Sequence, residues 1–157
     1  MTRHILSLRV NRRAIGAAVL AGEALIMADG RHLTSARDRA VPAAVRYVNR
    51  LLEQSGATTV VCDAPVPVQG SATQQLLDAI TDLLSSHGLT PILVAKSDVV
   101  TAYGLSPVPT QSEIRDIATG LWPQLAGITG RVKPYAADAA AAALYAECRI
   151  ALSPQPA

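Results

Sequence analysis

The sequence is poor in aromatic residues: it has no phenylalanine, one tryptophan and four tyrosines among 157 residues. Proteins that hold single-stranded nucleic acid commonly stack the bases on aromatic rings. The composition therefore argues against a base-stacking platform. Half of the residues are hydrophobic, mostly Ala, Val, Leu and Ile, which predicts a folded chain with a core of small aliphatic side chains.

Cysteine is also scarce. Cys62 lies in an apolar run and Cys148 in an alanine-rich segment, and they are the only two. No Cys-x-x-Cys pair or neighbouring histidine completes a metal ligand set. The two residues are expected to be reduced thiols, which is typical of a cytoplasmic protein.

Several well-known signals are missing. The first apolar stretch is interrupted by Arg9, Arg12 and Arg13, which is unlike a secretion signal. No apolar run reaches the roughly 18 residues of a membrane span. A Walker loop and a Gly-x-Gly-x-x-Gly loop are absent, so a dedicated nucleotide cradle is not predicted. The three histidines form no His-x-x-x-His pair of the kind that binds metal. We expect a cytoplasmic protein with no membrane partner.

Positive charge is concentrated in the first third of the chain. Residues 1–50 contain nine arginines and three acidic residues, whereas residues 51–157 contain five basic and nine acidic residues. The planar guanidinium group suits phosphate, so a basic segment of this kind indicates nucleic acid. A solvated charged surface accounts for the same charges, and both interpretations stay open at this point.

The pattern of apolar residues predicts three strands at the start of the chain, over 4–10, 14–22 and 24–33, joined by short turns as an antiparallel meander. A helix over 39–54 follows, with Val41, Val45, Val48 and Leu52 on one face.

The rest of the chain alternates in the same way. We predict a strand over 58–65, a helix over 71–87 and a strand over 90–95, with both strands parallel to the first. The remaining expectations are an irregular segment over 96–110, a helix over 111–126 interrupted near Trp122, a loop over 127–134, a final helix over 135–150, and a frayed tail over 153–157 after a single domain over 1–152.

This order resembles the RNase H-like superfamily, and within it the RuvC and YqgF type of Holliday-junction resolvase. Three motifs carry the resemblance, which covers residues 4–150: "ILSLRVNRRAIGAAVL", "VVCDAPVPVQGS" and "YAADAAAAAL". It implies an α/β fold with a mixed five-stranded sheet in the order 3-2-1-4-5, in which strands 1 to 3 are antiparallel and helices cover both faces.

Members of this superfamily cut phosphodiesters with two Mg²⁺ ions, which require hard oxygen ligands. The resemblance places the acid of the first strand at Arg9, that of the fourth strand at Asp63, and those of the last helix at Tyr135 and Asp138. Two of the four carboxylates remain, and a guanidinium group cannot ligate a cation. The resemblance therefore implies a degenerate active site that needs no cofactor, with Mg²⁺ expected only if the protein is active.

The three charged residues at these positions are predicted to converge. Arg9, Asp63 and Asp138 would then form a buried ion-pair cluster in place of the metals. Simpler explanations remain for each: Arg9 in solvent, Asp63 in a turn, and Asp138 favoured by the helix dipole.

Three functions follow from this interpretation. The first is a degenerate resolvase-like protein that binds branched or duplex DNA, with phosphate contacts from Arg12, Arg13, Arg31, Arg37, Arg39 and Lys96. The second is an active Mg²⁺-dependent endonuclease in which Asp29 or Asp98 completes a rearranged carboxylate cage. The third is an interaction module without nucleic acid, which binds a protein partner. The resemblance also implies a homodimer.

Overall fold

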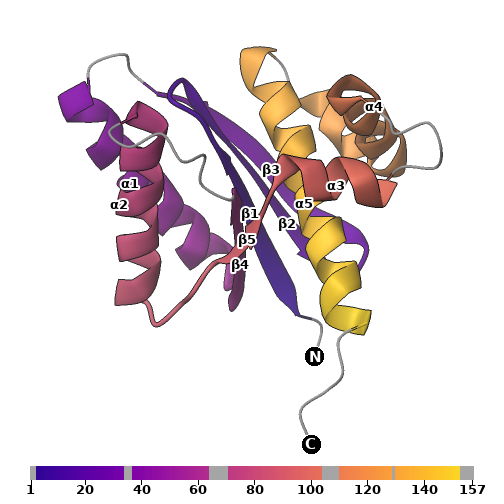
Figure 1. The fold of residues 1–157 in the computed structure, drawn as a ribbon, viewed down its shortest axis with the longest axis horizontal. Helices are drawn as coiled ribbons and strands as arrows, with labels where there is room; N and C mark the ends of the chain where they lie inside the picture. The colour runs from indigo at the N-terminus through magenta and orange to yellow at the C-terminus, as the bar shows by residue number, and fades with distance from the viewer. Residues whose placement is uncertain (1–2, 34–36, 64–70, 104–109, 129, 153–157) are drawn as a thin grey trace, which may run out of the picture.

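The computed structural model describes residues 3–33, 37–63, 71–103, 110–128 and 130–152. They form three layers, with a central sheet covered by α1 and α2 on one face and by α3, α4 and α5 on the other (Figure 1). The predicted tail over 153–157 lies outside the described residues. Within the described ranges, no helix is both long and apolar enough to cross a bilayer.

The sheet confirms the predicted order and directions. Its order is β3-β2-β1-β4-β5, with β1, β2 and β3 antiparallel and with β4 and β5 parallel to β1. The strands are β1 (His4–Val10), β2 (Ala14–Ala21), β3 (Ala24–His32), β4 (Thr59–Asp63) and β5 (Ile92–Val94).

The helices follow the prediction with one exception. They are α1 (Arg37–Ser55), α2 (Ala72–Ser86), α3 (Lys96–Tyr103), α4 (Gln111–Leu121) and α5 (Lys133–Leu152), with short 3₁₀ turns η1 (Pro123–Gly127) and η2 (Gly130–Val132). The interruption near Trp122 is confirmed, because α4 ends just before it and Pro123 opens η1.

The prediction of an irregular segment over 96–110 is wrong for its first half, which forms α3. This helix is short and weakly amphipathic, so its sequence gives little periodic signal. Tertiary contacts hold it instead: Val99 is buried, and the hydroxyl of Tyr103 donates to the carbonyl of Ala141 in α5 at 2.9 Å. Residues 104–109 lie outside the described part of the chain.

Strand β1 is buried on both faces. Leu6, Leu8 and Val10 pack toward α1 and α2, while Ile5 packs into a second cluster with α5. Because side chains alternate along a strand, Arg9 faces the α5 layer. The second cluster contains an unusual run of buried alanines from α5: Ala136, Ala137, Ala139, Ala140, Ala141, Ala142, Ala143 and Ala146.

Strand β3 contains a β-bulge. Its pairing with β2 skips Ile26, whose side chain is 57% exposed. Leu25 faces the α5 layer and Met27 packs with the opposite cluster, so the extra residue shifts the alternation of side chains by one. Asp29 therefore faces α1 and not α5.

The start of α5 and the η2 turn before it lie directly on the sheet because two glycines leave room for them. A Cβ atom built on Gly16 in β2 would lie 2.2 Å from the carbonyl carbon of Tyr135. A Cβ atom built on Gly30 in β3 would lie 2.5 Å from the Cβ of Val132. Any larger residue at Gly16 must push the first turn of α5 away from β2.

We expect Gly16→Ala to lower the free energy of unfolding by about 1–3 kcal/mol, as overpacking of a rigid backbone contact does. Gly120→Ala is the control, because Gly120 has no atom within 4 Å of the added Cβ. It is the second-last residue of α4, so alanine there should raise stability by at most about 0.5 kcal/mol. Urea unfolding of the two variants measures both effects, and equal effects would contradict the close contact.

Candidate functional site

The carboxyl ends of β1, β4 and β5 meet at one end of the sheet, beneath the start of α5 (Figure 1). Arg9 pairs with Gly16 on β2, the residue that the backbone of Tyr135 covers. Asp63 is the last residue of β4 and pairs with Val94 on β5. The fold thus brings the backbones of Arg9, Asp63 and Tyr135 to one end of the sheet.

Arg9 is a buried cation at this end. Its side chain is 4% exposed, and Nη1 donates to the carbonyl oxygen of Val94 at 3.1 Å. The guanidinium group therefore extends from β1 past β4 to the end of β5. The alternative in which Arg9 points into solvent is wrong. The side chain of Asp63 lies outside the described residues, so its pairing with Arg9 stays a prediction.

Asp138 in α5 is 4% exposed, and its partners come from α4. Its Oδ1 accepts from Nε2 of Gln111 at 2.7 Å and from Nε of Arg115 at 2.9 Å. Its Oδ2 accepts from Nη2 of Arg115 at 2.8 Å. The predicted pair between Asp138 and Arg9 is therefore wrong, because the arginine on Asp138 is Arg115.

Sequence reasoning missed Arg115 because it lies in a different helix, 23 residues before its partner. The only signal was the presence of a cation on α4, and helical spacing does not say which helix that cation will face. The hydrogen bond to Asp138 raises the pKa of Arg115 above its usual value. The pair is bidentate, which is the strongest geometry for arginine and a carboxylate.

The donor set at this end of the sheet does not fit the two Mg²⁺ ions that the resemblance implies. A cation occupies the end of β1, and both oxygens of Asp138 are already bound by Arg115. Among the residues that the structure describes, no three His, Cys, Asp or Glu side chains gather as a metal cluster.

Neither acid suggested for a rearranged cage reaches Asp138. Asp29 lies on the opposite face of the sheet, where its Oδ2 accepts from the hydroxyl of Tyr47 at 2.8 Å. The bulge at Ile26 is the reason, because regular alternation from Leu25 would turn Asp29 toward α5. Asp98 lies in the first turn of α3 and is exposed.

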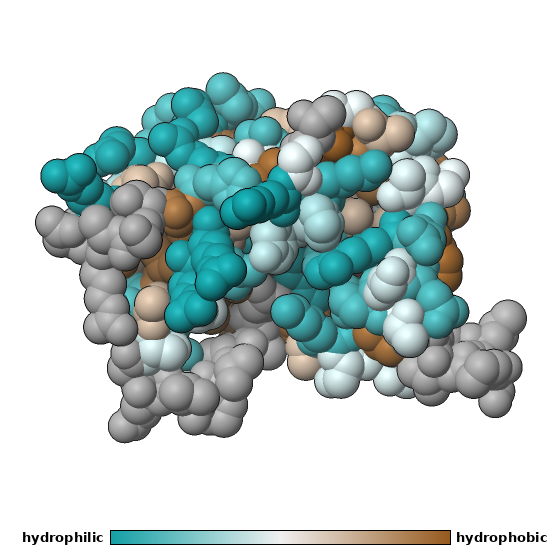
Figure 2. All heavy atoms as spheres, turned by 90° about the horizontal axis from the view of Figure 1, so that it is seen from above, coloured by the Kyte–Doolittle hydropathy of each residue, from teal (hydrophilic) through white to brown (hydrophobic). Residues whose placement is uncertain are grey.

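Exposed basic residues surround the same end of the sheet. Arg12 and Arg13 form the exposed turn between β1 and β2, and the carbonyl of Arg13 accepts from the N–H of Leu33 at 2.8 Å. This bond ties the turn to the end of β3, next to exposed Arg31. Figure 2 looks onto this end of the molecule and shows that hydrophilic side chains cover most of it.

The other predicted phosphate contacts border this area. Arg39 is exposed on α1 and Lys96 is exposed at the start of α3, just beyond the carboxyl end of β5. Arg37 begins α1, and its side chain lies outside the described residues. The order of the strands places Arg31 and Lys96 at opposite edges of the sheet, with Arg9 between them.

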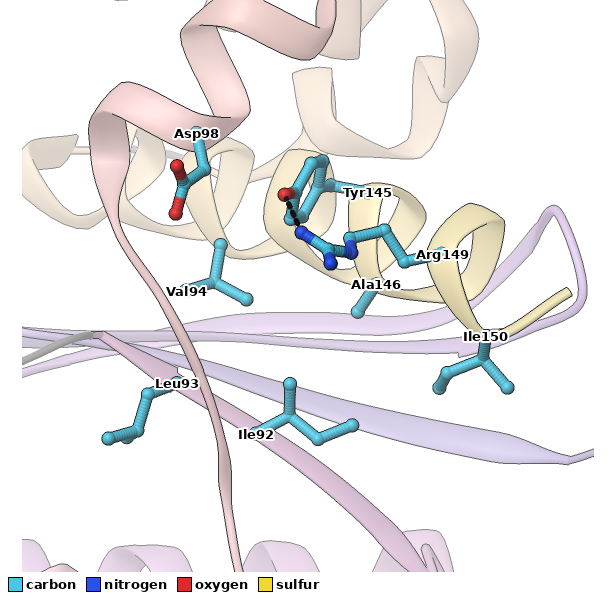
Figure 3. Close-up of a pocket in the computed structure, with 8 residues that line it drawn as sticks. All are labelled: Ile92, Leu93, Val94, Asp98, Tyr145, Ala146, Arg149 and Ile150. Atoms are coloured by element: carbon cyan, nitrogen blue, oxygen red, sulfur yellow. Dashed lines mark hydrogen bonds between the residues drawn. The ribbon is translucent and has the colours of Figure 1, made fainter. Parts of the chain in front are cut away.

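Two cavities lie beside the α-helices of the α5 layer. One, of about 350 Å³, is lined by Arg115 and Lys133 together with Asp116. The other, of about 290 Å³, lies between β5, α3 and α5, where Asp98 and Arg149 flank an apolar wall (Figure 3). Neither cavity is lined by Arg9 or Asp138.

This topology, with the end of β1 beneath the start of the last helix, is an RNase H-like α/β fold of the RuvC type. The structure is similar to that of Thermus thermophilus RuvC, with a TM-score of 0.74 and 16% identity over 94% of this chain and 96% of that one. It is equally similar to T. thermophilus RuvC in complex with Holliday junction substrate, with a TM-score of 0.74 and 15% identity over the same shares of the two chains.

A third similar structure is the yeast mitochondrial Holliday junction resolvase, with a TM-score of 0.67 and 11% identity over 95% of this chain and 81% of that one. Neither a protein-family profile nor a curated protein matches the sequence. The predicted fold is thus confirmed by structures that share few residues with this chain.

The pair between Arg115 and Asp138 should couple α4 to α5 energetically. We expect Arg115→Gln and Asp138→Asn, singly and together, to give a coupling energy of about 1–2 kcal/mol. This coupling energy is smaller than that of a fully buried pair, because the side chain of Arg115 is 35% exposed and solvent screens the charges. Urea unfolding of the four proteins measures the coupling, and additive effects within about 0.5 kcal/mol would contradict it.

Proposed function

We propose that this chain is a nucleic-acid-binding protein of RuvC fold that has lost metal-dependent cleavage. One observation carries the proposal: Arg9 is buried at the end of β1 and bonded to Val94 at the end of β5. The resemblance places there the acid that bridges the metals. The chain has kept the fold and exchanged the sign of the charge at its centre.

The magnitude of the electrostatic effect supports loss of cleavage. A divalent ion and a unit positive charge about 4 Å apart repel each other by roughly 8 kcal/mol at an effective dielectric constant of about 20. The carboxylate of Asp138 does not offset this repulsion, because its negative charge is neutralised by Arg115. The second hypothesis, an active endonuclease with Asp29 or Asp98 in the cage, has no support from the positions of those acids.

The exposed arginines at the same end of the molecule support nucleic-acid binding. Arg12, Arg13 and Arg31 adjoin one another at the turn between β1 and β2 and the end of β3. One of the similar structures is described as a complex with Holliday junction substrate. We therefore propose branched or duplex DNA as the ligand, bound by its phosphates. The homodimer remains a prediction, which sedimentation over a range of protein concentrations checks.

We expect the wild-type protein to bind a four-way DNA junction without cutting it in Mg²⁺ or Mn²⁺. In Arg9→Asp, an added carboxylate replaces the repelling cation, so Mn²⁺ should raise the midpoint of thermal unfolding of the variant but not of the wild type. This readout works even if the variant is less stable. Cleavage by the wild type that is lost in Asp138→Asn would overturn the assignment of a degenerate site.

Binding should depend steeply on salt, because each phosphate contact releases counterions. We expect Arg12→Gln/Arg13→Gln to weaken binding to the junction and to lower the slope of log K against log salt by about 2. The control is Arg3→Gln, because Arg3 lies just before β1, at the opposite end of that strand from Arg9, beside Glu147. A loss per removed charge that is equal in the two proteins would point to total charge and not to a defined interface.

A further inference from the structure

Three arginines line one side of the outer face of α1. Arg39, Arg46 and Arg50 are exposed and are separated by seven and four residues, so they follow one side of the helix. No acidic residue occurs between Arg39 and Arg50. We call these three residues the α1 stripe.

The neighbouring helix differs in charge. The helix that packs beside α1 is α2, which exposes Asp78 and Asp82 and contains no lysine or arginine. The acidic residues of α1, Asp38 and Glu53, lie before and after the α1 stripe. The stretch from Arg39 to Arg50 is positive, and its charge reflects the excess of arginine in the first third of the sequence.

A buried tyrosine fixes one end of the α1 stripe. Tyr47 is 2% exposed, and its hydroxyl is held by Asp29. The guanidinium carbon of Arg50 lies 5.7 Å from the centre of its ring, and that of Arg31 lies 5.9 Å from it. Two arginines from different elements thus flank one aromatic ring, which restrains their side chains.

The same tyrosine adds no charge of its own between the two arginines, and the one carboxylate beside it is the exposed Asp29 that accepts its hydrogen bond. Burial raises the pKa of Tyr47 well above its usual value, and the hydrogen bond with Asp29 adds to the shift. Arg31 also belongs to the basic end of the sheet, so Tyr47 joins that surface to the α1 stripe.

From this arrangement we infer that the α1 stripe binds the phosphate backbone of a duplex DNA arm that extends away from the basic end of the sheet. The inference rests on the proposed function and adds Arg46 and Arg50 to its contacts. The sequence alone does not predict this surface. Arg31 lies beside Tyr47 of α1 because the bulge in β3 shifts the alternation of side chains, and the bulge is a tertiary feature.

The dimensions of the α1 stripe suit a duplex. Arg39 and Arg50 are eleven residues apart, which is about 16 Å along a helix, or roughly five base-pair steps of about 3.4 Å. Between the arginines this face carries Pro42 and Ala43, which are small, so the guanidinium groups protrude furthest. A single strand is a poorer fit, because it needs exposed aromatic rings and Tyr47 is buried.

The test is the double variant Arg46→Gln/Arg50→Gln, bound to four-way junctions with long arms and with arms shortened to about six base pairs. On long arms, we expect the variant to lose affinity and the slope of log K against log salt to fall by about 2 relative to the wild type. Shortening the arms should lower the slope of the wild type and leave that of the variant unchanged.

Two matched proteins control for charge and folding. Arg46→Lys/Arg50→Lys keeps both charges and should retain the wild-type slope. Arg149→Gln removes an exposed cation from the last turn of α5, at the opposite end of that helix from the basic surface (Figure 1), and should leave binding to long arms unchanged. The thermal unfolding midpoint of the double glutamine variant should fall only slightly, because both substituted side chains are exposed and the described contact that is lost is that of Arg50 with the ring of Tyr47.

The outcomes separate this inference from the proposed function. If the double glutamine variant binds long arms with the wild-type slope while Arg12→Gln/Arg13→Gln loses affinity, the α1 stripe does not contact DNA and the proposed function stands. If the wild type binds neither junction, the proposed function fails and this inference fails with it. Loss of slope that is equal on long and short arms would also overturn the inference, because the contacts would then lie at the centre of the junction.

Discussion

The architecture depends on the contact between α5 and the face of the sheet formed by β1 and β2. A helix comes this close to a sheet only when the side chains between them are small. In this chain the requirement is met twice, by the buried alanines of α5 and by Gly16 beneath Tyr135. The contact places the first turns of the helix over the carboxyl end of β1. Arg9 at the end of β1 and Asp138 in α5 are brought to the same end of the sheet by this contact, and β5 and α4 supply their hydrogen-bond partners.

The two buried charged residues near that contact, Arg9 and Asp138, have partners within the protein. Arg9 bonds a carbonyl of the sheet, and Asp138 is neutralised by a neighbouring helix. In this pair Asp138 is buried and Arg115 is partly exposed, so the loss of Arg115 would leave a buried carboxylate without its ion-pair partner, which is costly. Single substitutions of Arg9, Arg115 or Asp138 are therefore expected to lower the stability of the protein. The arginines on the surface carry no such constraint, because they face solvent.

Much of the fold could be predicted from the sequence, because alternating strands and amphipathic helices leave periodic signals. The strands around Arg9 and the helix with Val48 on its apolar face are examples. Three features could not be predicted, each because it depends on tertiary contacts. The helix α3 is held by the hydrogen bond from Tyr103 to Ala141 of α5. Arg115 of α4 binds Asp138 of α5. The bulge at Ile26 turns Asp29 away from the site. For the candidate site, the motifs indicated Arg9 and Asp138, which are both buried, but not the partners of their side chains.

The bulge has a consequence for how the protein can associate. A regular edge strand offers a row of free N–H and C=O groups, which can template the addition of a strand from another chain. At one edge of this sheet, β3 is nine residues long but is interrupted at Ile26. At the other edge, β5 is three residues long. Both edges are therefore poor templates for intermolecular β-pairing, and recruitment of a partner falls to side chains, among which the arginines of the first third of the chain are the most numerous charged group.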